Sequence, residues 1–266
     1  MAEAIAERIG VGEGDARREI ALLRRPGGEP GLFWLGGFRS EMTGSKASAL
    51  DAFGAARGLA VTRLDYSGHG ASGGDFLVGT VSRWLEEALA VFGTTSGPQV
   101  VIGSSMGGWL ALLLNRALRA RGDERVRALV LIAPAVDMTA DLMEATFTKK
   151  QKKSLAEEGV VYEPSDYGDP YPLTRGLIED GRSHLLFGKG IVTGCPVTIL
   201  QGAMDRDVPK EHAMKLVQHL LTDPVTLTLV PDGDHRLSRD EDLRLLESAV
   251  SRAAEEAVPR QMSLDV

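Results

Sequence analysis

The chain has 266 residues, of which 43% are hydrophobic and 25% charged, and a formal net charge of −7 at pH 7; this suits one large α/β domain or two small ones. The acidic balance excludes the basic patch or stripe that binds nucleic acids. No apolar run approaches the roughly 18 residues needed to span a membrane, so we expect no integral membrane segment.

The N-terminus and the cysteine content bear on location. Residues 1–8 lack the basic start and the apolar stretch of a signal peptide, and they carry too many acidic groups for a transit peptide. The single cysteine, Cys195, forms no internal disulfide, which fits a reducing compartment. We interpret its thiol as structural, because no partner base is implied near it. These features predict a cytoplasmic protein.

Short apolar runs alternate with amphipathic helices along most of the chain. The expected strands are residues 20–23, at an edge of the sheet, and residues 31–35, 59–64, 98–102, 127–133, 197–200 and 225–230. The expected helices are residues 46–56, a helix capped by Thr80, and residues 106–118, 209–221 and 241–254. This alternation predicts an α/β fold with a mostly parallel central sheet and helices on both faces. Ligand sites in such sheets lie at the carboxyl ends of the strands.

The alternation breaks once, between Pro134 and Cys195, where the chain is polar and shows no clear strand. An insertion of this length in a compact domain is usually functional. We predict a small helical cap at approximately residues 137–192, inserted after the strand that follows the helix of residues 106–118. The cap and the sheet together form a single domain over residues 1–266.

The sequence Gly103-Ser104-Ser105-Met106-Gly107 stands between an apolar strand and a helix. Gly-x-Ser-x-Gly in this setting is typical of a nucleophile elbow, in which a sharp turn exposes the serine. Residues 70–74 match the same pattern around Ser72, but glycines rather than a helix follow them. We therefore predict Ser105 as the nucleophile and Ser72 as a loop residue.

A serine hydroxyl needs a base to take its proton. His235 follows the last expected strand directly, so its loop would reach the carboxyl edge of the sheet. His69, in a glycine-rich loop, is the second candidate. His212 and His219 are expected on the solvent side of their helix, and His184 lies inside the cap.

The base in turn needs an acid that orients it. Asp205 and Asp207 both follow the strand of residues 197–200. We favour Asp205, which comes first in a Gly-x-x-Asp turn, and leave Asp207 to support the loop or to cap the next helix. Asp234 neighbours the histidine but would point elsewhere. The chain order is then serine, aspartate, histidine, as in α/β-hydrolases.

The tetrahedral intermediate of acyl transfer carries an oxyanion that needs preorganised donors. The residue after the nucleophile, Met106, offers one backbone N–H. The loop after the strand of residues 31–35 should offer the second, and its Gly36-Gly37 pair permits a close approach of the backbone. We predict the Phe38 amide as this donor. A tight turn alone would also explain the two glycines.

Several loop and cap segments carry a more specific resemblance. They are Gly37-Phe38-Arg39-Ser40 with Gly44-Ser45-Lys46, Asp65-Tyr66-Ser67-Gly68 with Gly70, residues 103–109, Ile132-Ala133-Pro134-Ala135, Ile178-Glu179-Asp180-Gly181-Arg182 and Gly233-Asp234-His235-Arg236. With the elbow, they resemble the abhydrolase-domain-containing-10 family of palmitoyl-protein thioesterases and acyl-glucuronide esterases, within the α/β-hydrolase superfamily. The resemblance implies an α/β-hydrolase fold and places the family's nucleophile, acid and base on Ser105, Asp205 and His235. The chain lacks an evident mitochondrial presequence, so the location of the animal members is not implied.

These observations predict a serine hydrolase that cleaves carboxylic esters or thioesters through an acyl-enzyme. Its partner would be a small-molecule acyl ester or thioester, or an acylated protein, with no metal, organic cofactor or nucleic acid. The alternatives on the same triad are a C–C bond hydrolase, a lactonase or a peptidase. A non-catalytic ligand receptor on this fold is the alternative from a different class. The acyl chain, the leaving group and the oligomeric state are not predicted.

Overall fold

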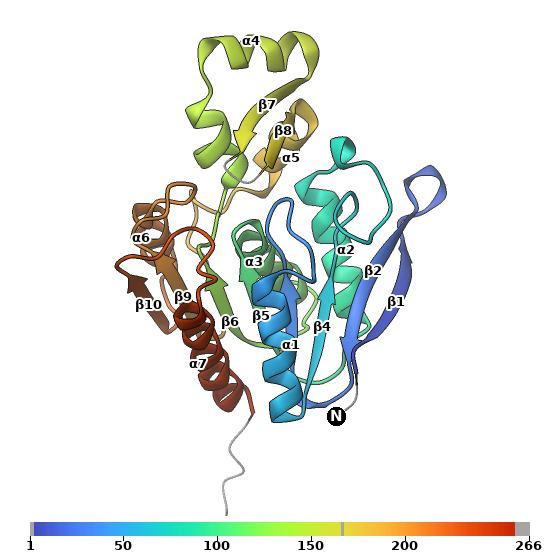
Figure 1. Ribbon diagram of the computed structural model, residues 1–266, viewed down its shortest axis with the longest axis vertical. Helices are drawn as coiled ribbons and strands as arrows, with labels where there is room; N and C mark the ends of the chain where they lie inside the picture. Colours follow the sequence, from blue (N-terminus) through green and yellow to red (C-terminus); the bar gives the residue numbers. More distant parts are fainter. Residues whose placement is uncertain (1–2, 166–167, 259–266) are drawn as a thin grey trace, which may run out of the picture.

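The computed structural model describes residues 3–165 and 168–258. The strands of its main sheet are β1 (Ile5–Val11), β2 (Arg18–Arg25), β3 (Gly28–Leu35), β4 (Leu59–Leu64), β5 (Gln99–Ser104), β6 (Val126–Ile132), β9 (Val197–Gly202) and β10 (Val225–Val230). Within the described residues these eight strands lie in the order β1-β2-β4-β3-β5-β6-β9-β10 (Figure 1). Neighbours from β4 to β10 are parallel, whereas β2 is antiparallel to β1 and to β4. The predicted α/β fold with a mostly parallel sheet is confirmed.

Helices cover both faces of the sheet (Figure 1). They are α1 (Ser45–Arg57), α2 (Val81–Gly93), α3 (Met106–Arg119), α6 (Lys210–His219) and α7 (Asp240–Ala257). On one face, α1 and α7 contribute Leu50 and Val250 to a buried apolar layer. On the other, α2, α3 and α6 contribute Trp84, Trp109 and Leu216. Because both faces are covered, the central strands are apolar on both sides, which is why they appear in the sequence as unbroken apolar runs.

The edge of the sheet differs from the prediction. Residues 20–23 are expected to form an edge strand, and this expectation is wrong, because β1 pairs along the outer side of β2. Within β1 only Val11 is buried, and Ile5 is 53% exposed. A strand that buries so little of its surface gives a weak hydrophobic pattern, and β1 is therefore hard to detect from sequence.

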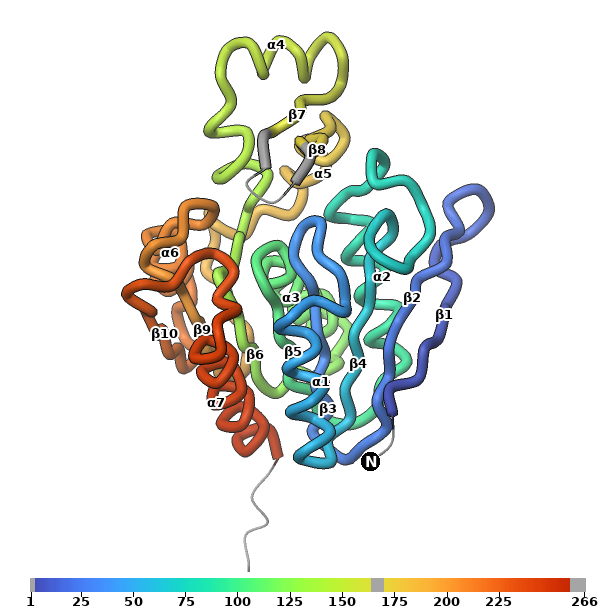
Figure 2. The backbone as a smooth tube through the Cα atoms, in the orientation of Figure 1, coloured from blue at the N-terminus to red at the C-terminus, as the bar shows by residue number. Residues whose placement is uncertain are grey.

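Between β6 and β9 the chain leaves the sheet at the carboxyl end of β6, builds a layer of small elements and returns (Figure 2). This segment contains α4 (Lys149–Glu158), β7 (Val160–Ser165), β8 (Gly168–Thr174) and α5 (Arg175–Gly181), with short helical turns at Thr139–Met143, Glu144–Thr146 and Arg182–His184. The expected helical cap without a clear strand is wrong in this respect, because β7 and β8 form an antiparallel pair. Pro170 and Pro172 lie in β8. Prolines argue against a central strand, but a two-stranded pair leaves each strand an edge without ladder bonds.

Hydrogen bonds join the two ends of this segment at its root, the point where it leaves and re-enters the sheet. Asp137, where the chain leaves the sheet, accepts hydrogen bonds from the amides of Leu186 (2.7 Å) and Phe187 (2.8 Å), where the chain returns. The Asp137 side chain is buried, and burial raises the pKa of its carboxyl group. These bonds hold the start and the end of the segment side by side where it joins the sheet.

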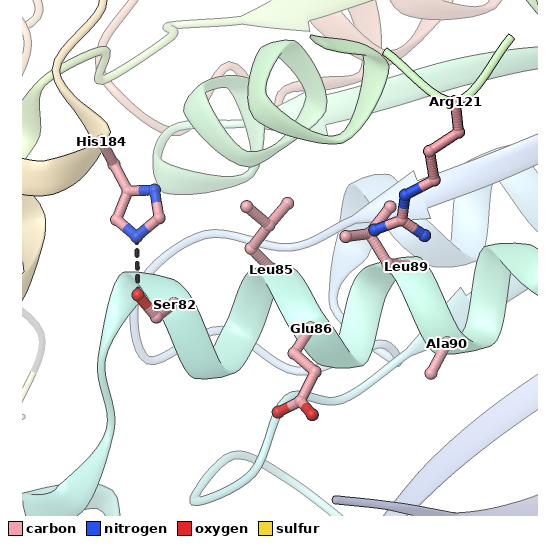
Figure 3. Close-up of a pocket in the computed structure, with 7 residues that line it drawn as sticks. All are labelled: Ser82, Leu85, Glu86, Leu89, Ala90, Arg121 and His184. Carbon is pink, nitrogen blue, oxygen red and sulfur yellow. Dashed lines mark hydrogen bonds between the residues drawn. The ribbon is translucent and has the colours of Figure 1, made fainter. Parts of the chain in front are cut away.

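A second attachment joins α5 to the first turn of α2. The Asp180 carboxylate accepts hydrogen bonds from the Ser82 amide (2.8 Å) and hydroxyl (2.6 Å), at a helix N-terminus that favours negative charge. His184 Nε2 lies 2.7 Å from the same hydroxyl, beside a cavity of about 380 Å³ that Leu85 and Arg121 also line (Figure 3). Because the Ser82 proton is donated to Asp180, this hydroxyl joins α5 to α2 and is not an activated nucleophile.

Within the described residues, none of the helices has the length and apolar character required to cross a membrane.

Candidate active site

Ser105 occupies the turn between β5 and α3. Its φ of 55° and ψ of −119° are sparsely populated for a residue with a side chain, and such strain is typical of functional sites. The flanking glycines are required by close packing. A Cβ on Gly103 would lie 2.3 Å from the Gly107 carbonyl oxygen, and a Cβ on Gly107 would lie 2.1 Å from that of Leu35. The local sequence therefore folds into the sharp turn that its pattern predicts.

The loops after three parallel strands bring the predicted nucleophile, base and acid together. His235 Nε2 lies 3.1 Å from Ser105 Oγ, and His235 Nδ1 lies 2.8 Å from Asp205 Oδ2. Asp205 is 7% exposed, and its Oδ1 accepts the amides of Asp207 (2.9 Å) and Val208 (2.8 Å). The carboxylate is thus fixed by its own loop while its second oxygen faces the imidazole.

The other candidates for the nucleophile and the acid make different contacts. Ser72 donates its hydroxyl to the Asp65 carbonyl (2.6 Å) and accepts the Ala21 amide (2.8 Å), so it stabilises a loop. Asp234 accepts the Leu237 amide in its own loop (3.0 Å). Asp207 bears an exposed side chain.

Asp207 also belongs to the group that could hold a metal by geometry. Donor atoms of Asp205, Asp207 and His235 lie within 4.8 Å of one another. Asp205 and His235 are already hydrogen-bonded to each other, so a metal ion there would compete with that bond.

His212 is placed differently from its prediction. It was expected on the solvent side of α6, which is wrong, since the ring is buried and Nε2 donates to the Val136 carbonyl (2.7 Å). Burial lowers the pKa of this imidazole. The helix thus uses His212 to hold the chain at the end of β6, near the root of the segment between β6 and β9.

Residues 36–42, after β3, form a loop beside the elbow. A Cβ on Gly37 would lie 3.3 Å from Ser105 Cβ, so the loop backbone touches the serine. The Ser40 amide donates to the Gly37 carbonyl (3.1 Å) and closes a turn with Phe38 and Arg39 at its centre. On the other side of Ser105, Met106 begins α3, and amides at a helix N-terminus point outward without intrahelical partners. The Phe38 and Met106 amides as oxyanion donors stay a prediction.

His69, the second candidate for the base, supports this loop. Its Nε2 accepts the Arg39 amide (3.1 Å), and its Nδ1 donates to the Ser67 carbonyl (3.2 Å). Burial lowers the pKa of this imidazole to about 4, so the ring is neutral and carries its proton on Nδ1. Both nitrogens are occupied away from Ser105. This role was not predicted from the sequence, although His69 lies between Gly68 and Gly70, which belong to the segments that carry the family resemblance.

Lys46, for which the sequence predicts no role, lies near the candidate site. Its ammonium group donates to the carbonyl of Arg236, the residue after His235. Burial lowers the pKa of Lys46 to about 8. The first turn of α1 is thereby tied to the loop that carries the base.

Aromatic rings form a wall between the loop of residues 36–42 and the segment above it. The ring of Phe38 lies 5.1 Å from Phe76, 5.9 Å from Trp84 and 5.9 Å from Tyr171 of β8, measured between centroids. The Arg39 guanidinium carbon lies 5.4 Å from the Tyr171 centroid. The segment between β6 and β9 therefore contacts Phe38 and Arg39, which lie in the loop beside Ser105.

Comparison with known proteins adds to this geometry. Residues 41–164 match a family described as serine aminopeptidase, S33. The mitochondrial palmitoyl-protein thioesterase ABHD10 of Mus musculus is 34% identical over 230 residues, which cover 85% of this chain and 76% of that protein. The cytoplasmic location expected from the sequence is wrong on this finding, because these curated relatives are mitochondrial proteins.

Solved structures agree with the sequence relatives. A putative hydrolase from Agrobacterium vitis S4 is 49% identical, with a TM-score of 0.92, and the alignment covers 94% of this chain and 99% of that one. The structure of the mouse α/β-hydrolase domain-containing protein 10 has a TM-score of 0.83 at 29% identity and covers 95% of this chain and 100% of that one.

Proposed function

We propose that this chain, which belongs to the ABHD10 family of α/β-hydrolases, is a serine hydrolase that cleaves carboxylic esters or thioesters through an acyl-enzyme. The observation that carries the proposal is the hydrogen-bonded series Ser105 Oγ, His235 and Asp205, with distances of 3.1 and 2.8 Å. This arrangement provides a nucleophile, a general base and an orienting carboxylate.

In the acylation step, His235 Nε2 takes the Ser105 proton as Oγ attacks the carbonyl carbon of the substrate. The Phe38 and Met106 amides stabilise the oxyanion that forms. The intermediate collapses to the acyl-enzyme, and the imidazolium gives its proton to the departing alcohol or thiol. A water molecule then repeats the sequence on the acyl-enzyme and regenerates Ser105. Asp205 keeps the Nδ1 proton in place and stabilises the imidazolium. The cycle requires neither a metal nor an organic cofactor.

The substrate class rests on two supports. The relatives are named palmitoyl-protein thioesterases, which favours an acyl thioester or ester, small or attached to a protein. The rings of Phe76 and Tyr171 pack against Phe38, which follows the Gly37 backbone that touches Ser105, and aromatic side chains near a nucleophile suit an apolar acyl chain better than a polar one.

We also propose that residues 137–192 act as a cap within a single domain of residues 1–266. The contact of Tyr171 with Phe38 supports this, since it brings the segment to the loop beside Ser105. So do the attachments at Asp137 and Asp180, which hold the segment at the carboxyl end of the sheet.

The test is a kcat/KM series of acyl thioesters and matched oxyesters of increasing chain length, with p-nitrophenyl esters, lactones and peptides as further substrates. We expect turnover of esters and thioesters, and a kcat/KM that rises with acyl length over the shorter members of the series. Turnover of peptides alone would replace the proposal with a peptidase. Tight ligand binding without any turnover would indicate a receptor.

Asp180→Ala tests the role of the cap. The change removes the carboxylate that accepts the Ser82 amide and hydroxyl, bonds that resemble those of a helix cap and are worth about 1 kcal/mol. A loosened cap should raise KM for a long-chain thioester about fivefold, while kcat for an acetyl ester stays near that of the wild type. Steady-state kinetics on the two substrates measures this.

The matched control is Arg182→Ala, two residues further along. Arg182 pairs with Glu144 in an exposed ion pair within the segment, and such pairs contribute little. If Arg182→Ala shifts KM as much as Asp180→Ala does, the attachment to α2 does not control substrate binding.

A further inference from the structure

The loop of residues 36–42 is held in place by Arg63 near the end of β4 and by residues that follow this strand. The Asp65 carboxylate accepts the Met42 amide (2.6 Å), and the Arg63 guanidinium donates to the Met42 carbonyl (3.0 Å). His69 Nε2 accepts the Arg39 amide (3.1 Å). Besides the bond that closes the turn within the loop, contacts from outside it therefore hold this loop at its centre and at its end.

The contact at the centre lies on a strained residue. Arg39 has a φ of 58°, in the left-handed region that favours glycine or asparagine at the third position of such a turn. A residue with a Cβ keeps this conformation only where its surroundings enforce it. The acceptor on His69 contributes to that enforcement, since it fixes the direction of the Arg39 N–H.

His69 is itself held rigidly. Its Nδ1–H is bonded to the Ser67 carbonyl, and the Ser67 amide (2.8 Å) and hydroxyl (2.6 Å) donate to the buried carboxylate of Glu87 on α2. The ring also packs against Trp84, at 5.4 Å between centroids. A continuous chain of hydrogen bonds thus runs from the interior of α2 to the loop.

We propose that His69 is a positioning residue for the hydrolysis described above: by holding the Arg39 amide, it fixes the turn that directs the neighbouring Phe38 amide at the oxyanion. This inference rests on the proposed function. His69 does not touch the substrate and transfers no proton. Its contribution is realised in the tetrahedral intermediate, because only there does the Phe38 amide meet a full negative charge.

The test compares His69→Phe with His69→Gln. Phenylalanine keeps an aromatic ring in the cluster but has no acceptor for the Arg39 amide, whereas the glutamine amide oxygen can accept it. The readout is the affinity for a small alkylboronic acid, which adds to the serine hydroxyl and places a tetrahedral oxygen where the oxyanion forms. We expect His69→Phe to weaken boronate binding and to lower kcat by about 10- to 100-fold, with KM for a short ester unchanged. His69→Gln should recover most of both losses.

Two further variants separate positioning from general destabilisation. Ser72→Ala removes a hydroxyl that holds the same segment without touching residues 36–42; it should lower the Tm and leave boronate affinity unchanged. Arg39→Gly in the His69→Phe background relieves the left-handed strain and should restore part of the boronate affinity. Equal boronate affinities in wild type and folded His69→Phe would overturn the inference. A wild-type protein that neither binds boronate nor reacts with a fluorophosphonate would instead overturn the proposed function.

Discussion

Replacing Ser105 with alanine should abolish labelling by a fluorophosphonate probe and lower kcat by roughly 10⁴- to 10⁶-fold. The substitution removes the Oγ that lies 3.1 Å from His235 Nε2 and leaves the imidazole without a proton to take. Alanine carries the same Cβ as serine, so the strain at φ 55° is retained and the elbow keeps its shape. Intact-protein mass spectrometry after probe treatment, together with ester turnover, measures both effects.

Ser72→Ala is the control for this experiment, because Ser72 lies in the other Gly-x-Ser-x-Gly match. Its variant should be labelled at the wild-type stoichiometry. Labelling that disappears in Ser72→Ala, or that persists unchanged in Ser105→Ala, would show that the nucleophile is assigned to the wrong serine.

Asp205→Asn should lower kcat by roughly 10⁴-fold while the protein stays folded. The asparagine carbonyl can still accept the amides of Asp207 and Val208, which hold the loop. Its amide nitrogen then faces His235 Nδ1 and donates to it, so the imidazole proton moves to Nε2. In that tautomer Nε2 cannot accept the Ser105 proton. Pre-steady-state acylation with a p-nitrophenyl ester measures the loss directly.

Asp207→Asn is the matched variant. The Asp207 side chain is exposed, and its link to the site is through its backbone amide, which the substitution keeps. Surface changes of this kind usually stay within about 0.5 kcal/mol, so acylation should remain within about twofold to threefold of wild type. A loss as large as that of Asp205→Asn would move the role of the acid to Asp207.

The parallel strands of the sheet were predictable, because burial on both faces makes the central ones continuous apolar runs. The meeting of the candidate site residues was predictable from topology, since Ser105, Asp205 and His235 each follow a parallel strand. Parallel strands end at one edge, so three residues distant in sequence meet there. The residue types and their positions after the strands were therefore enough to predict that these three residues lie close together.

What the sequence could not predict depends on contacts between segments. β1 lies at an edge and buries too little to show a pattern, and the β7–β8 pair contains prolines that argue against strands. His212 is polar on a helix, and only its bond to the Val136 carbonyl explains its burial. The role of His69 depends on the φ of Arg39, thirty residues earlier in the chain. The residues around His69 carry no pattern from which a backbone angle in another loop could be predicted.

The burial of His69 also couples unfolding to proton uptake. Its pKa in the folded protein is about 4, compared with an ordinary value of 6.5, so between these values the unfolded chain binds a proton that the folded protein does not. The stability that the neutral ring contributes is complete above about pH 6.5 and is lost as the pH falls through about 4, a change of about 3 kcal/mol. A protonated His69 cannot accept the Arg39 amide. Acid therefore weakens the fold at the same residue that shapes the loop beside Ser105.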